Sequence, residues 1–232
     1  AGHAVPSSRC GPYRRSPTPW SRPRGETLAR IAQYELAFRM QSEAADAFDL
    51  SREPQHIHDA YGDGTHGHQL LITRRLLERG VRFVQVWSGA GQPWDNHNDL
   101  EKQHRKLAGD WDGPIAAFLG DLKQRGLLDS TLVLWGGEFG RTPTINKDAG
   151  RDHWPRVSMA LLACGGLNHG QVIGATDRLG GEASERPVTF AEVHATLYHA
   201  LGIDPNSTTV KDLNGRPHYL VENNAQPLHE VI

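Results

Sequence analysis

The feature that most constrains this chain is a short apolar run at residues 131–135. Two glycines end the run, and a polar turn follows them. A run of this length and composition predicts a buried β-strand. Glu138 and Arg141 come soon after it, and the next loop brings Asp152 and His153. In open α/β sheets, ligands bind at the carboxyl ends of the strands. Carboxylate and imidazole groups at such an end favour a divalent metal site. The alternative is a solvated turn with an ion pair.

A second predicted strand leads into a similar polar cluster. Residues 81–87 are rich in β-branched and aromatic side chains, which is typical of a strand, and Asp95 and His97 follow it. Neighbouring parallel strands place their carboxyl-end loops side by side. We therefore expect the loops around Asp95, Glu138 and His153 to meet at one edge of a sheet.

Helical and strand patterns alternate along the rest of the chain. Apolar residues at three- and four-residue steps predict helices, which glycines or prolines then end. The predicted helices cover residues 26–48, 69–79, 100–125 and 189–201, the third interrupted or kinked at Gly113-Pro114, and the predicted strands cover residues 81–87, 131–136 and 157–163. This order indicates an α/β layer protein with a largely parallel sheet.

Charge and hydropathy limit the partners that we expect. The chain has 25 Lys and Arg residues against 27 Asp and Glu residues, and it has no basic stripe with interleaved aromatic residues. This pattern argues against a nucleic-acid partner. No apolar stretch is long enough to span a bilayer. Residues 1–26 are rich in Pro, Arg, Ser and Gly, so we interpret them as a disordered or non-native lead-in to a domain at residues 27–232.

Five motifs in a fixed order carry a resemblance to a known family. They are Arg79-Gly-Val-Arg-Phe-Val-Gln-Val86, Trp94-Asp-Asn-His97, the run from Thr131 to Arg141, Gly150-Arg-Asp-His-Trp-Pro155, and the segment from Arg186 to Ile203. Together they resemble the DUF1501 family, a group of sulfatase-like proteins in the alkaline phosphatase superfamily. The resemblance covers residues 27–232 and the carboxyl-terminal portion of a typical member. It implies an alkaline phosphatase-like, three-layer α/β/α fold with a mostly parallel sheet, incomplete at its N-terminal side.

The resemblance also assigns roles to single residues. The strand that ends in Ser-Asp-His-Gly in sulfatases matches this chain up to Gly140, so that Glu138 takes the place of a metal-binding Asp and Phe139 the place of a histidine ligand. His153 matches the final metal-ligand histidine. Asp95 and His97 resemble the Asp and His that serve the other metal, although relatives usually space them by four residues rather than two.

The expected chemistry is metal-dependent hydrolysis of sulfate or phosphate esters, carried by small molecules or polysaccharides. A divalent ion, which could be Zn, Ca, Mg or Mn, holds the ester oxygens and activates a hydroxyl group or a water molecule. Asp152 is a further candidate ligand. Arg141 then stabilises charge on a phosphoryl or sulfuryl oxygen, because guanidinium is a planar donor of two hydrogen bonds. The family resemblance implies an exported or periplasmic protein.

Two other hypotheses remain open. The chain could be a non-catalytic relative that acts as a binding or structural protein. It could also be incomplete and inactive alone, because the superfamily's first metal-binding Asp and its nucleophile lie on a segment that this chain does not contain.

Overall fold

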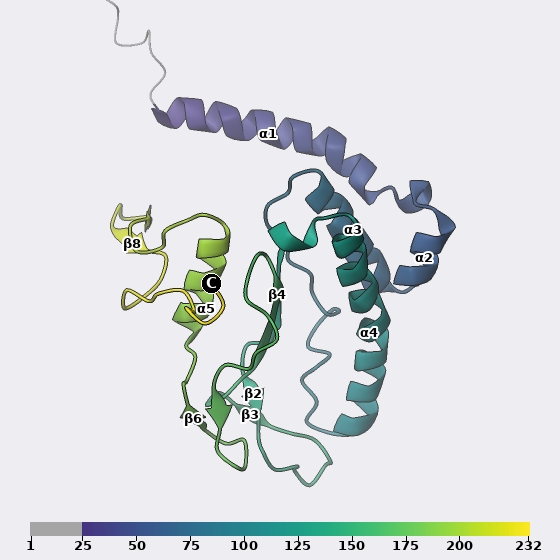
Figure 1. Cartoon of the computed structure of the whole chain (residues 1–232), viewed down its shortest axis with the longest axis vertical. Helices are drawn as coiled ribbons and strands as arrows, with labels where there is room; N and C mark the ends of the chain where they lie inside the picture. The colour runs from purple at the N-terminus through teal and green to yellow at the C-terminus, as the bar shows by residue number, and fades with distance from the viewer. Residues whose placement is uncertain (1–24) are drawn as a thin grey trace, which may run out of the picture. The chain divides into compact units, whose positions relative to one another are not determined.

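The computed structural model describes residues 25–232 (Figure 1). The chain divides into two units, residues 1–46 and 47–232, and each is described by itself. α1 (Gly25–Phe48) contains the described residues of the first unit and agrees with the helix predicted over residues 26–48. The predicted lead-in at residues 1–26 lies outside the described residues, apart from its last two residues, which belong to α1.

The second unit combines helices with short strands. Its helical elements are η1 (Leu50–Arg52), α2 (Gln55–Tyr61), α3 (Thr65–Glu78), α4 (Leu100–Gln124), η2 (Leu128–Ser130) and α5 (Phe190–Ala200). Its strands are β1 (Leu132–Gly136), β2 (Gly140–Arg141), β3 (His153–Trp154), β4 (Ala160–Cys164), β5 (Ala175–Thr176), β6 (Ala183–Glu185), β7 (Thr209–Lys211) and β8 (Pro217–Tyr219). The α/β class is therefore confirmed as a mixture of helices and strands. Within residues 25–232, no helix has both the length and the apolar character needed to cross a membrane.

The strand pairing differs from the prediction. The described strands form four separate two-stranded antiparallel pairs, β1–β4, β2–β3, β5–β6 and β7–β8. Parallel neighbours need a crossover connection, which is usually a helix, whereas the loop between β1 and β4 contains only β2 and β3. Residues 81–87 adopt no regular secondary structure, since no strand in the described part of the chain pairs with them. The expected parallel, three-layer sheet is thus replaced here by antiparallel ribbons.

The core lies where three helices meet one face of β1. α3 packs beside α4, and α2 packs against both (Figure 1). Val133 of β1 packs against this helical cluster, whereas its neighbour Leu132 packs against a second cluster near the carboxyl end. Successive residues of a strand point to opposite faces, so both faces of β1 carry apolar contacts. The first cluster comprises Ile57, Tyr61, Leu70, Leu71, Trp111, Phe118 and Leu122, and the second Leu167, Leu228 and Val231.

Three of the four predicted helices keep their ranges in the structure, and the fourth begins earlier. α4 and α5 match their predicted ranges, α4 continues through Pro114 without interruption, and Thr189 forms a capping box with Glu192 at the start of α5. α3, however, begins at Thr65, four residues before the predicted helix, and takes up part of the glycine-rich loop. Gly67 permits this early start, because a Cβ at that position would overlap the carbonyl oxygen of Tyr61.

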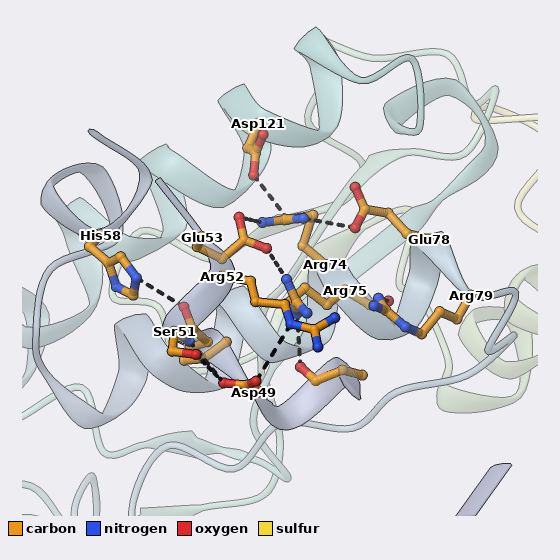
Figure 2. A network of polar contacts seen from close by, with 12 residues as sticks. Asp49, Ser51, Arg52, Glu53, His58, Arg74, Arg75, Glu78, Arg79 and Asp121 are labelled. Atoms are coloured by element: carbon orange, nitrogen blue, oxygen red, sulfur yellow. Dashed lines mark hydrogen bonds and ion pairs between the residues drawn. The ribbon is translucent and has the colours of Figure 1, made fainter. Parts of the chain in front are cut away.

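A buried ion network joins these helices next to the apolar core (Figure 2). Arg74 of α3 is only 2% exposed and contacts Glu53 at 2.5 Å, Glu78 at 2.7 Å and Asp121 of α4 at 3.2 Å. Arg75 donates a second hydrogen bond to the Glu53 carboxylate. The carboxylate of Asp121 also accepts hydrogen bonds from Tyr61 and Arg125. The buried members of the network are Arg74, Arg75, Glu53 and Asp121, so two buried cations face two buried carboxylates.

The network keeps the Glu53 carboxylate ionised in spite of its burial. Desolvation alone would raise the pKa of Glu53, but the hydrogen bonds from Arg74 and Arg75 outweigh it, and the pKa lies below its ordinary value. Loss of one cation would leave a buried charge without a partner, which is the costly way to disrupt such a network.

We predict that Arg74→Met destabilises the protein by about 3–5 kcal/mol, because it leaves Glu53 and Asp121 short of a buried cation. Urea unfolding of the full chain, followed by circular dichroism, measures the change. Arg105→Met is the matched control, since Arg105 is 77% exposed and its pair with Glu101 is solvated; we expect an effect of about 0.5 kcal/mol or less. Equal losses in both variants would contradict a stabilising role for the network.

Candidate metal centre

The β2–β3 pair brings two predicted site residues to one carboxylate. Arg141 lies directly opposite His153 in the antiparallel register, so the two side chains project from the same face. Both reach Asp95: Arg141 donates a hydrogen bond from Nη1 to Oδ1, and Nε2 of His153 lies 2.9 Å from the same oxygen. A short ribbon thus fixes an arginine and a histidine around one acidic group.

The loop that carries Asp95 is fastened to the loop before β3 by backbone hydrogen bonds. The amide of Arg151 donates to the carbonyl of Asn96 at 3.1 Å, and the amide of Leu100 donates to the carbonyl of Ala149 at 3.0 Å. Gly150 is needed at the crossing, because a Cβ there would overlap the carbonyl group of His97. The glycine that precedes the Arg-Asp-His sequence therefore allows the two loops to touch.

Three side chains converge at this junction. One ligand atom from each of Asp95, His97 and His153 lies within 4.8 Å of the other two, and Nε2 of His97 is 3.1 Å from Oδ1 of Asp95. The Asp95 side chain is 19% exposed, whereas the two imidazoles are about half exposed. The carboxylate is therefore the more sheltered member of the group, and the imidazoles are open to solvent.

The surroundings hold both acids of the site in their ionised form. The hydrogen bond from Arg141, followed by that from His153, lowers the pKa of Asp95 to about 2. The hydrogen bond with His97 lowers the pKa of Asp152 as well. Both carboxylates are thus available as negative charges for a cation throughout the neutral pH range.

The contacts of the two ring nitrogens of His97 indicate that the group suits a cation. Nδ1 of His97 lies 2.8 Å from a carboxylate oxygen of Asp152, which can only accept, so this nitrogen carries the proton. In a neutral ring Nε2 is then an acceptor, yet it faces the Asp95 carboxylate, which is also an acceptor. Two acceptors so close together need positive charge between them, supplied either by a second proton on His97 or by a metal ion.

The spacing of the ligand atoms agrees with a small metal ion. Zinc bonds of 2.0–2.1 Å in a tetrahedral arrangement separate neighbouring ligand atoms by about 3.3 Å. The separations from Asp95 to His97 and His153 are 3.1 and 2.9 Å. A shift of a few tenths of an ångström would therefore bring each imidazole nitrogen to this spacing from Asp95.

The structure does not bring every predicted site residue into this group. Glu138 is exposed and forms no hydrogen bond or ion pair within residues 25–232. Its neighbour Phe139 lies against His153 instead, with ring centroids 4.9 Å apart, and the guanidinium of Arg141 lies over the same ring. Asp152 contacts His97 but stands outside the three-residue group.

Asn146 contributes to the site but was missed in the sequence. Its amide nitrogen donates to the carbonyl of His97 at 3.0 Å and to Asp152 at 3.3 Å. Its side-chain oxygen accepts from the backbone amides of Asp148 and Gly150. An Asn followed by Asp and Gly within a short loop predicts a turn in which the Asn side-chain oxygen accepts from nearby backbone amides. The pattern does not show which distant residue the side-chain nitrogen of Asn146 contacts.

We predict that Arg141→Gln raises the pKa of Asp95 from about 2 towards its ordinary value of 3.8, because the strongest of its hydrogen-bond donors is lost. Carbon NMR titration of the Asp95 carboxyl group in chelator-treated protein measures the shift. Arg151→Gln is the control, since Arg151 donates to the carbonyl of Thr142 and not to Asp95. An unchanged titration of Asp95 in Arg141→Gln would contradict the proposed electrostatic coupling.

Comparison with known proteins agrees with the motifs at this site. Neither curated proteins nor solved structures include a match to the chain. A family profile described as "Protein of unknown function (DUF1501)" matches residues 16–232, which include all of the residues of the candidate metal centre. The chain therefore belongs to the DUF1501 family.

Proposed function

We propose that this chain is a sulfatase-like member of the alkaline phosphatase superfamily whose metal centre hydrolyses sulfate or phosphate esters. The observation that carries the proposal is the convergence of Asp95, His97 and His153, with Arg141 beside them. These residues come from three separate sequence motifs, and the fold gathers them around one oxygen atom. The order of those motifs supports the superfamily assignment.

The donor set favours zinc over calcium and magnesium. Two imidazole nitrogens and one carboxylate oxygen suit zinc, whereas calcium and magnesium prefer all-oxygen sites. Three protein ligands are also typical of catalytic zinc sites, in which the remaining position is open. The half-exposed imidazoles of His97 and His153 leave that side of the group accessible.

The chain's own residues supply the other requirements of ester hydrolysis. A zinc ion, when bound, polarises the ester and lowers the pKa of a water molecule or hydroxyl group. Arg141 uses Nη1 for Asp95, and its other nitrogens form no hydrogen bond with the described residues. Those donors suit an anionic phosphoryl or sulfuryl oxygen. Asp95 orients Arg141 towards the same space that the two histidines line.

A second candidate function is a non-catalytic role in binding or structure. It is favoured by the ion pairs Arg141–Asp95 and His97–Asp152, which would balance their charges without any metal if His97 were protonated. It is also favoured by the position of Glu138, which stands where sulfatases carry a metal-binding Asp but lies outside the group. The two candidates differ in whether the chain binds zinc at all.

We predict that the purified full chain binds about one zinc ion and hydrolyses an aryl phosphate or an aryl sulfate. His153→Ala removes one of the three ligands found within residues 25–232, so it should lower zinc affinity and activity by about 100-fold or more. Elemental analysis after dialysis and a chromogenic ester assay measure both quantities. His169→Ala is the control, because His169 is an exposed loop histidine outside the group.

The outcomes separate the two candidates. Zinc binding with ester hydrolysis, both lost in His153→Ala and retained in His169→Ala, supports the hydrolase. A chain that binds no zinc and leaves both esters intact is the non-catalytic relative.

A further inference from the structure

We propose that Asp152, held in place by Asn146, is a positioning residue that determines which nitrogen of His97 faces the metal centre. The inference rests on the proposed metal site and assigns Asp152 a role other than the ligand role expected from the sequence. It follows from the hydrogen bonds that surround His97 on the side away from Asp95.

The His97 ring is held at both of its nitrogens. Nδ1 lies 2.8 Å from Oδ1 of Asp152, and Nε2 lies 3.1 Å from Oδ1 of Asp95. A carboxylate oxygen can only accept a hydrogen bond, so this contact selects the tautomer with the proton on Nδ1. That tautomer leaves a lone pair on Nε2, which is the nitrogen next to His153 and Asp95. Because the ring is 46% exposed, packing alone does not fix its orientation.

Asn146 places the Asp152 carboxylate correctly for this task. Its amide group donates to Oδ1 of Asp152 and to the backbone carbonyl of His97, so one side chain ties the acid and the histidine together. The backbone amide of Asp152 donates to the hydroxyl group of Thr142, which adjoins β2. The carboxylate is thus anchored from both the ribbon and the loop, although it is itself more than half exposed.

This arrangement is that of an outer carboxylate on a metal-binding histidine. Such carboxylates fix the tautomer and the ring orientation, and their loss typically weakens metal binding by about 10- to 100-fold. Asp152 fits this description because its Oδ1 already contacts His97 and Asn146. Asp152 also lies outside the group of Asp95, His97 and His153.

The test compares Asp152→Asn with Asp148→Asn in the full chain. Both variants remove one negative charge from the same loop, but the Asp148 side chain is exposed and makes no contact with His97. Nitrogen NMR of the metal-free protein reports the tautomer of His97 in its neutral form. Competition with a chromogenic chelator reports the dissociation constant for zinc.

We expect the Nδ1-protonated tautomer of His97 in the unmodified chain and in Asp148→Asn. In Asp152→Asn we expect a mixture of tautomers and a 10- to 100-fold weaker affinity for zinc. Circular dichroism checks that the variant is folded, and Asp152→Ala provides a second variant that cannot hydrogen-bond to the ring at all.

Three results decide the inference. Unchanged tautomer and zinc affinity in both Asp152 variants would overturn it and leave the metal site standing. If the unmodified chain binds no zinc, the proposed function fails, whereas the tautomer measurement still shows whether Asp152 sets the protonation of His97. An equal loss of zinc affinity in Asp148→Asn would assign the effect to loop charge instead and would also overturn the inference.

Discussion

The candidate site depends on one oxygen atom, Oδ1 of Asp95, towards which Arg141, His97 and His153 all point. Arg141 donates a hydrogen bond to this oxygen, whereas Nε2 of His97 is an acceptor when Nδ1 carries the proton, so positive charge is needed between His97 and Asp95. Arg141 keeps this group ionised, and Asp152 directs the lone pair of His97 towards it. The arrangement concentrates negative charge and nitrogen lone pairs at one point, and that is the condition under which a metal ion binds.

The buried helical core of the second unit differs in its environment from the candidate metal centre. The buried network around Arg74 lies next to the apolar cluster of α2, α3 and α4, and together they stabilise the helical part of the unit (Figure 2). The candidate metal centre, by contrast, is built on loops and on the two-residue strands β2 and β3, and its imidazoles are about half exposed. Loops positioned by a rigid scaffold are where binding and catalytic residues are usually found. At Gly150 the two loops of the site approach each other so closely that a Cβ would overlap the carbonyl group of His97, and this approach brings their side chains together.

Much of this could be predicted from the sequence. The ranges of α1, α4 and α5 followed from apolar periodicity and caps, such as the capping box of Thr189 and Glu192, but α3 begins earlier than predicted. The pairing of the strands could not be predicted, because the sequence of a strand does not specify its partner. The prediction of parallel neighbours was wrong for β1 and β4, which pair antiparallel and whose connecting loop contains no helix. At the site, the loops around Asp95 and His153 do meet, but Glu138 does not join them. Side-chain contacts between distant loops, such as those of Asn146, depend on backbone approach that no local pattern encodes.

The most direct test of the central claim is anomalous X-ray diffraction at the zinc edge, on crystals of the full chain grown with zinc. The account predicts one peak within about 2.0–2.2 Å of a carboxylate oxygen of Asp95 and of Nε2 of both His97 and His153. Absence of a peak at this position, with the ion pairs between Asp95, Arg141 and the histidines intact, would contradict the claim that these residues form a metal centre.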